Sequence, residues 1–306
     1  MAISDDIDLD IDTFLIPIQL IYERRKQEPM SWREMFRVLL EILRPMNCLM
    51  AGVAAIIGLL IAGEWIAEPG ILIFLIVFFI TGAGNAINDY YDRRIDAVNR
   101  PGRPIPSGRV SPQAIMVWAI SLSALGIILA SQISQICLAI AWLNSILLFF
   151  YARNFKVTPL VGNISVSYLT GSTFLFGGAA YGLSGLWDNM VPCMLSCLIT
   201  MSREIAKDIE DIDGDRQGGA KTLPILAGIR FSAALEAAFA FAGIGLSYMA
   251  NLGTFYVIII SISNLLFLAS IRMILLKGDA SESQKLLKMG MAVALLAFLV
   301  GALYTI

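Results

Sequence analysis

Histidine is absent from this chain of 306 residues, and cysteine is scarce. The lack of histidine excludes Ser-His-Asp triads, histidine-ligated zinc or haem, and imidazole general bases. The four cysteines stand in apolar stretches and form no C-x-x-C pair; they are Cys48, Cys137, Cys193 and Cys197. We interpret them as small buried side chains rather than as metal ligands or redox groups.

Charged residues are few for a chain of this length. They make up 15% of the sequence, whereas a soluble domain has about 25%. Hydrophobic residues make up 58% of it, and the mean hydropathy is +0.75. This composition predicts a polytopic membrane protein.

Long apolar stretches recur along the whole chain. A helix needs about 20 mainly apolar residues to cross a bilayer. Nine stretches approach or exceed this length, at roughly 46–63, 70–91, 113–131, 133–152, 159–182, 187–209, 231–250, 254–271 and 286–306. The sequence therefore predicts an all-α fold with nine transmembrane helices.

The basic residues predict the orientation. All 22 Lys and Arg precede the first span, end span six, or lie in the loops after spans two, four, six and eight. The opposite loops, near 64–69, 132, 183–188 and 251–253, contain none. Because Lys and Arg are retained on the cytoplasmic side, we expect a multi-pass protein of the cell membrane with its N-terminus in the cytoplasm and its C-terminus outside.

The N-terminal region divides into two parts. Residues 1–30 begin with a run of aspartates, and we expect them to form a poorly ordered acidic tail. Residues 31–44 place six apolar side chains on one helical face, namely Trp32, Met35, Phe36, Leu39, Leu40 and Leu43. This pattern favours an amphipathic helix in the cytoplasmic interface, separated from the first span by Pro45. Residues 31–306 are predicted to form a single domain.

Two acidic clusters follow spans two and six, both on the predicted cytoplasmic side. The first reads Asn88-Asp89-Tyr90-Tyr91-Asp92-Arg93-Arg94-Ile95-Asp96. The second reads Asp208-Ile209-Glu210-Asp211-Ile212-Asp213-Gly214-Asp215. Carboxylates near lipid cost free energy and repel one another, so such clusters need cations to offset them.

Helical spacing indicates which side chains act together. Asn88, Asp92 and Asp96 fall at i, i+4 and i+8, on one face over roughly 12 Å of helix. Asp211 and Asp215 repeat the i, i+4 spacing on a helical continuation of span six, and Asp208 shares their face only loosely. Two such faces across a cavity would hold Mg²⁺ ions bridged by a diphosphate, because hard cations prefer oxygen ligands. Glu210 and Asp213 are predicted to point elsewhere.

Basic and aromatic residues complete the predicted site. Four cations on three cytoplasmic loops are candidate phosphate ligands, namely Arg100, Arg103, Lys156 and Lys221. Each of them can also be explained as a basic residue that only marks the cytoplasmic side of the membrane. Tyr151, at the end of span four, either faces a developing carbocation with its ring or anchors the helix at the interface.

These motifs resemble a known family. The first cluster, followed by Asn99-Arg100-Pro101-Gly102-Arg103-Pro104-Ile105-Pro106-Ser107-Gly108, looks like the signature of UbiA-type intramembrane prenyltransferases. The second cluster, followed by Gly219-Ala220-Lys221-Thr222, looks like that family's second aspartate motif. The resemblance covers the chain from about residue 36.

The resemblance implies nine helices around a central cavity and Mg²⁺-assisted departure of diphosphate from a polyprenyl donor. It places Asn88, Asp92 and Asp96 in the first motif and Asp211 and Asp215 in the second, with Asp208 a rival for the role of Asp211.

The stretch 43–52 is similar to the first span of the archaeal branch. That branch implies transfer of a geranylgeranyl group from geranylgeranyl diphosphate to the hydroxyl of geranylgeranylglyceryl phosphate, forming an ether bond of archaeal membrane lipids. Lys156 is the first candidate for binding the acceptor's phosphate, because its loop carries no acidic motif. No protein partner or nucleic acid is implied.

Other functions share part of this pattern. A prenyltransferase with an aromatic acceptor, making quinone or haem side chains, would have the same motifs. A CDP-alcohol phosphotransferase would need a D-G-x-x-A-R signature, which the sequence lacks. A transporter with a carboxylate relay would place its acidic groups near the bilayer midplane rather than at one face.

Overall fold

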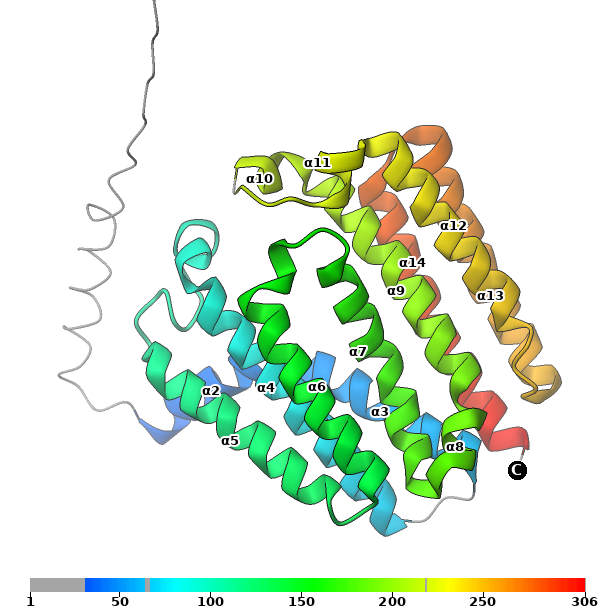
Figure 1. The fold of residues 1–306 in the computed structure, drawn as a ribbon, viewed down its shortest axis with the longest axis horizontal. Coiled ribbons are helices and arrows are strands. Elements are labelled where there is room, and N and C mark those ends of the chain that lie inside the picture. The colour runs from blue at the N-terminus through cyan, green and yellow to red at the C-terminus, as the bar shows by residue number, and fades with distance from the viewer. Residues whose placement is uncertain (1–30, 64–66, 218, 306) are drawn as a thin grey trace, which may run out of the picture.

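The computed structural model describes residues 31–63, 67–217 and 219–305, so the predicted acidic tail of residues 1–30 lies outside the described residues. Within these ranges every regular element is a helix (Figure 1). The long helices are α3 (Pro45–Ala62), α4 (Ala67–Asn99), α5 (Pro112–Ala130), α6 (Gln135–Arg153), α7 (Val161–Gly178), α9 (Met190–Glu210), α12 (Ile229–Ser247), α13 (Gly253–Arg272) and α14 (Ala280–Thr305). Their positions match the nine predicted spans to within several residues, and the all-α prediction is confirmed.

Seven of the described helices are long and apolar enough to cross a membrane, namely α3, α4, α5, α6, α12, α13 and α14. The remaining two, α7 and α9, contain more polar residues. Helix α7 buries glycines and serines between α3 and α9, and the last turns of α9 carry Arg203, Glu204, Lys207 and Asp208. The chain is an integral membrane protein, while the count of nine spans stays a prediction.

Glycines allow the interior helices to approach closely. A Cβ added to Gly177 of α7 would lie 1.9 Å from the Ala55 carbonyl oxygen of α3. A Cβ added to Gly58 of α3 would lie 2.3 Å from the Phe174 carbonyl oxygen of α7. Small residues at such crossings let two backbones touch, which is a common basis of helix packing in membranes.

A buried carboxylate joins the C-terminal helices. Glu236 of α12 is fully buried, and its Oε1 accepts hydrogen bonds from Ser202 of α9 at 3.0 Å, Ser270 of α13 at 3.3 Å and Ser283 of α14 at 3.2 Å. Three other helices are thereby tied to α12. Buried polar groups need such partners because an unpaired one is costly in a low-dielectric interior.

The predicted amphipathic helix is α2 (Trp32–Leu43), and it begins with a capping box between Ser31 and Glu34. Arg44, at φ 50° and ψ 68°, separates it from α3, which starts at Pro45. Val38 and Ile42 are buried, whereas Trp32 and Phe36 are exposed. An exposed aromatic face suits a helix that lies in a membrane interface.

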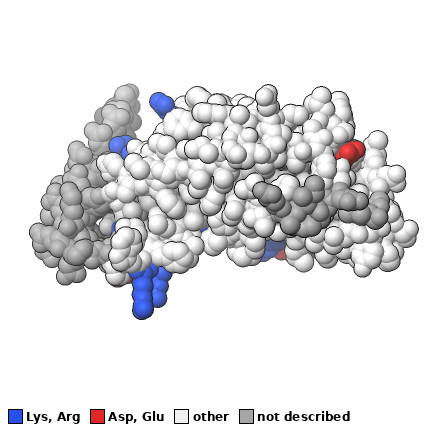
Figure 2. Space-filling model, turned by 90° about the horizontal axis from the view of Figure 1, so that it is seen from below, with Lys and Arg blue, Asp and Glu red and all other residues white. Residues whose placement is uncertain are grey.

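Charge is distributed unevenly over the surface. Figure 2 shows a face that is almost free of charged residues, with most of the visible Lys and Arg toward the side of α2. A broad uncharged surface of this kind fits contact with lipid.

Candidate active site

The first acidic cluster lies on a projecting part of α4. This helix has 33 residues, and at about 1.5 Å per residue it is longer than the roughly 30 Å hydrocarbon core of a bilayer. The helix continues without a break to Asn99, as predicted, so Asn88, Asp92 and Asp96 are successive i, i+4 positions on it. Their backbone is thus held rigid at one end of the bundle.

Protein cations neutralise this cluster. The Lys156 Nζ donates to Asp92 Oδ2 at 2.6 Å. Arg103 lies 2.5 Å from Asp96 Oδ2 and 3.3 Å from Asp89 Oδ1, and Arg44 lies 2.5 Å from Asp89 Oδ1. Asp92 and Asp96 therefore bind different cations, although they share one helical face in the predicted pattern.

A folded loop positions Arg103. Hydrogen bonds from Arg103 N to Arg100 O at 3.0 Å and from Ser107 N to Arg103 O at 2.9 Å fold the segment after α4 into turns. Arg109 closes the segment onto α2 through two bonds to Glu41, at 2.7 and 3.0 Å. The interfacial helix and the first cluster are consequently one connected unit.

Asn88 offers an oxygen without a partner. Its Oδ1 is buried and accepts no hydrogen bond from the described residues. Buried polar atoms are nearly always paired, so an orphaned acceptor needs a physical explanation. An amide oxygen beside carboxylates is a donor type that Mg²⁺ accepts.

The second cluster lies at the end of α9 and just beyond it. Asp208 accepts a hydrogen bond from Asn163 Nδ2 of α7 at 2.8 Å. Glu204, four residues earlier, is buried and forms an ion pair with Arg203. Asp208 and Glu204 thus place two carboxylates on the inner face of α9.

The predicted continuation of span six through Asp215 is wrong in one respect. Helix α9 ends at Glu210 with Asp211 as its C-cap, and Asp215 lies on a separate short helix, α10 (Ile212–Gln217). The Asp215 amide still donates to the Asp211 carbonyl at 2.9 Å, so the i, i+4 spacing is preserved. Asp211 is exposed, whereas Asp208 and Asp215 are half-buried.

Of the two remaining acids, Glu210 points away from the cluster, as predicted. Glu210 accepts a hydrogen bond from Gln284 of α14 at 2.8 Å, and Asp213 is exposed.

The two clusters converge near Tyr151 and Lys156. Tyr151 lies within electrostatic range of Asp92 on α4 and of Glu204 and Asp208 on α9. Lys156, on the 3₁₀ turn η1 (Phe155–Val157), bonds to Asp92 and is also within range of Asp215. Both acidic clusters therefore lie around the same two residues, although more than a hundred positions separate Asp92 from Asp208 in the sequence.

Charge repulsion is apparent at Asp215, outside the membrane-spanning segments. Burial and the neighbouring Asp211 carboxylate raise the pKa of Asp215 above its usual value, and they outweigh the Thr222 side chain and the charges of Lys207 and Lys156, which lower it. The raised pKa means that an added cation at Asp215 would relieve an unfavourable charge.

Two of the predicted phosphate ligands have no acidic partner. Arg100 and Lys221 are exposed and make no ion pair with any described residue. By contrast, Arg103 and Lys156 are engaged with carboxylates.

Sequence reasoning missed four residues of this region, namely Arg44, Asp89, Asn163 and Glu204. Helical spacing contains a signal for two of them. Glu204 precedes Asp208 by four residues, and Asp89 precedes Asp96 by seven, so each pair shares a face. Arg44 and Asn163 belong to other helices, and no local pattern connects them with the clusters.

The residues present fit a divalent cation by donor type. Their free or exchangeable atoms are carboxylate oxygens and the orphaned Asn88 amide oxygen, which are the ligands that Mg²⁺ prefers. Among the described residues, no three carboxylates or cysteines are close enough to hold a metal ion without rearrangement. Protein donors instead bind the carboxylates, as the Lys156 and Asn163 contacts show.

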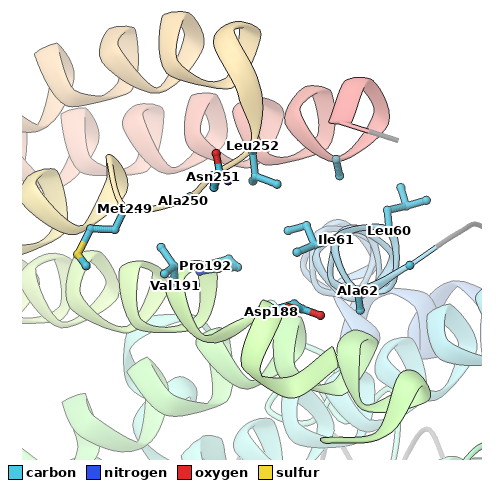
Figure 3. A pocket seen from close by; sticks show the side chains of 12 residues that line it. Leu60, Ile61, Ala62, Asp188, Val191, Pro192, Met249, Ala250, Asn251 and Leu252 are labelled. Carbon is cyan, nitrogen blue, oxygen red and sulfur yellow. The ribbon is translucent and has the colours of Figure 1, made fainter. Parts of the chain in front are cut away.

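A pocket of about 420 Å³ lies at the other end of the bundle (Figure 3). It is formed by the end of α3 at Leu60, the start of α9 at Pro192, and the loop between α12 and α13 at Leu252. Asp188 provides a carboxylate to its lining. Since α4 and α9 both run from that end toward the acidic clusters, this pocket is separate from the candidate active site.

Comparison with known proteins shows which family this chain resembles. The model of the UbiA prenyltransferase family matches residues 51–305. The chain is 52% identical over 265 residues to digeranylgeranylglyceryl phosphate synthase of Methanothrix thermoacetophila. The aligned region covers 86% of this chain and 98% of that relative.

Solved structures agree with this result. A structure described as digeranylgeranylglyceryl phosphate synthase in membranes superposes with a TM-score of 0.78 at 36% identity, covering 88% of this chain and 99% of that one. A UbiA homologue from Archaeoglobus fulgidus bound to DMAPP and Mg²⁺ has a TM-score of 0.64 at 18% identity, over 84% of this chain and 98% of that chain, and it supports the fold. The chain therefore belongs to the UbiA prenyltransferase family.

Proposed function

We propose that this protein transfers a geranylgeranyl group from geranylgeranyl diphosphate to the free hydroxyl of geranylgeranylglyceryl phosphate, with Mg²⁺ as cofactor. The observation that carries the proposal is the convergence of two acidic clusters at one end of a membrane bundle, around Tyr151 and Lys156. Similarity over nearly the full length of a digeranylgeranylglyceryl phosphate synthase supports this choice of substrates.

The cation would be held by oxygen ligands from both clusters. Asn88 and Asp92 of α4 and Asp208 and Asp215 of the second cluster are the proposed set. Asp96, which Arg103 holds, and the exposed Asp211 lie at its edge. When bound, Mg²⁺ would stabilise the negative charge that develops on the departing diphosphate.

Basic side chains would also stabilise the negative charge on the departing diphosphate. Arg103 and Lys156 lie against the first cluster, where a metal-bound diphosphate would come. Electrostatic groups already in place around developing charge are usually the largest single contribution in such sites. We assign Lys156 to the donor diphosphate, since it lies between the two clusters.

The acceptor brings a phosphate of its own and needs further cations. Arg100 and Lys221 are exposed and free of ion pairs with described residues, so they are the candidates for that phosphate. This assignment departs from the sequence-based preference for Lys156, because the ammonium of Lys156 bonds to Asp92.

The reaction then needs no protein nucleophile. The bond between the allylic carbon and the diphosphate oxygen breaks, the electron pair leaves with diphosphate, and the acceptor hydroxyl oxygen bonds to the carbon. Diphosphate carries away the hydroxyl proton in the overall balance. Tyr151 lies within electrostatic range of carboxylates from both clusters, and in this proposal its ring stabilises the positive carbon. The surrounding apolar helices exclude water.

The location of the site in the membrane follows from charge. The loops that carry both clusters also contain the Lys and Arg residues, so we place them in the cytoplasm by the positive-inside rule.

The direct test is an assay in lipid nanodiscs with geranylgeranyl diphosphate and geranylgeranylglyceryl phosphate, followed by mass spectrometry. We expect the diether phosphate product, its loss in excess EDTA, and its recovery when Mg²⁺ is restored. Full turnover in EDTA would contradict the metal assignment. Turnover with an aromatic acceptor alone would favour the quinone-type or haem-type alternative.

A further inference from the structure

Lys156 has an unusual place in the candidate active site. Its Nζ is 2.6 Å from Asp92 Oδ2, and the side chains are 38% and 13% exposed, respectively. Asp92 is one of the proposed ligands of the cation, and in the protein alone it is already paired. Another cation therefore has to compete with Lys156 for this carboxylate.

The Lys156 ammonium and a bound Mg²⁺ would repel each other at Asp92. Mg²⁺ binds carboxylate oxygens at about 2.0–2.1 Å, so an ammonium on the same carboxylate would stand within a few ångströms of a double positive charge. Like charges at such a distance repel strongly in a partly buried site. An anion that attracts Lys156 would remove this repulsion.

Lys156 is the more exchangeable of the cations at the first cluster. It has one carboxylate partner, a flexible stem and a short 3₁₀ turn as its base. Arg103 holds both Asp89 and Asp96, is 20% exposed, and belongs to a loop fixed by backbone hydrogen bonds. The geometry thus distinguishes a fixed cation from a movable one.

We propose that Lys156 is a place-holding cation, which occupies Asp92 in the free protein and releases it to the metal when a diphosphate arrives to bind the ammonium. The inference rests on the proposed function. It predicts that metal and diphosphate bind cooperatively, because each favours the arrangement that the other needs. Binding of the metal before the donor is thereby disfavoured.

The test measures Mn²⁺ binding by electron paramagnetic resonance, with and without inorganic pyrophosphate, in nanodiscs. The variants are Lys156→Met, a second substitution Lys156→Gln, and the control Arg153→Met. Arg153 is an exposed cation three residues earlier that makes no ion pair with a described residue. Thermal melting of each variant checks that it is folded.

In wild-type protein we expect weak binding of Mn²⁺ alone and at least about tenfold tighter binding with pyrophosphate, which is a usual coupling between two ligands. Lys156→Met and Lys156→Gln should bind Mn²⁺ alone about tenfold more tightly than wild type, with a smaller gain from pyrophosphate. Arg153→Met should match wild type. Adding Asp92→Asn to Lys156→Met should remove the gain in affinity for Mn²⁺ alone.

The outcomes separate this inference from the proposed function. If pyrophosphate promotes Mn²⁺ binding in wild type but both Lys156 variants bind Mn²⁺ alone no better than wild type, the place-holding role is wrong and the metal site stands. If no variant binds Mn²⁺ even with pyrophosphate, the metal-dependent function fails together with it.

Discussion

At the residue scale, the second cluster contains two aspartates that compete for one role. Asp208 is half-buried, bonds to Asn163 at 2.8 Å and lies within electrostatic range of Tyr151, whereas Asp211 is an exposed C-cap. We expect Asp208→Asn to lower kcat at least about a hundredfold, which corresponds to about 2.7 kcal/mol. Asp211→Asn should cost less than about tenfold.

Glu210→Gln is the matched control for this pair. Its side chain accepts a hydrogen bond from Gln284, and a glutamine carbonyl preserves that acceptor. Steady-state kinetics of the three variants in nanodiscs provide the comparison. A Glu210→Gln variant as impaired as Asp208→Asn, or an Asp211→Asn variant more impaired than it, would contradict the placement of the site on the inner face of α9.

Asp215 should show a conflict between stability and function. Burial and Asp211 raise its pKa in the folded protein, so its charged form destabilises the metal-free fold. That cost is present above the folded-state pKa and disappears as the pH falls through it toward the unfolded-state value. Metal-free Asp215→Asn should therefore melt at a higher temperature than wild type at pH 7, with the difference shrinking on acidification, and should lose activity.

Melting curves in EDTA between pH 4 and pH 8 measure this effect. A metal-free variant that is less stable than wild type at pH 7 would show that Asp215 makes a stabilising contact, against the repulsion inferred from its surroundings.

At the element scale, the α3 and α7 crossing should tolerate no added side chain. The Cβ of Gly177→Ala would lie 1.9 Å from the Ala55 carbonyl oxygen, a backbone contact that only separation of the helices relieves. We expect a loss of several kcal/mol of stability, as for severe overpacking. Gly245→Ala on α12 is the control, because nothing lies within 4 Å of its added Cβ.

Folded yield and melting temperature in detergent test the crossing. Gly245→Ala should equal or exceed wild type, since alanine favours a helix over glycine. Equal melting temperatures for wild type and Gly177→Ala would mean that the two helices are less closely packed than the structure has them.

The helices were largely predictable from the sequence, and the contacts between them were not. Spans and the amphipathic helix follow from local hydropathy, and the i, i+4 face of α4 follows from its regular backbone. The pairing of Asp89 and Asp96 with Arg103 depends on how the loop after α4 folds. The end of α9 at Glu210 and the contact of Asn163 with Asp208 depend on tertiary packing, which periodicity does not contain.

At the scale of the whole molecule, the proposed orientation is testable with single cysteines. Gly102 lies in the basic loop after α4 and Ser184 lies on α8 (Gly182–Asp188) at the opposite end, and both are exposed. In right-side-out vesicles, a membrane-impermeant maleimide should label Ser184→Cys directly and Gly102→Cys only after permeabilisation. Wild-type protein is the background control, because three of its four cysteines are buried and Cys197 is half-buried. The reverse labelling pattern would place the active site outside.

We propose that one end of this bundle unites a prenyl diphosphate, Mg²⁺ and a phosphorylated glycerol ether. The most direct measurement is a competition in nanodiscs, with limiting geranylgeranyl diphosphate and equal amounts of geranylgeranylglyceryl phosphate, its unphosphorylated glycerol ether and 4-hydroxybenzoate. A site with cations for a second phosphate should form the diether phosphate in at least about a hundredfold excess, because a missing charged partner typically costs several kcal/mol. Equal use of the unphosphorylated ether, or preferential prenylation of the aromatic acid, would contradict the account.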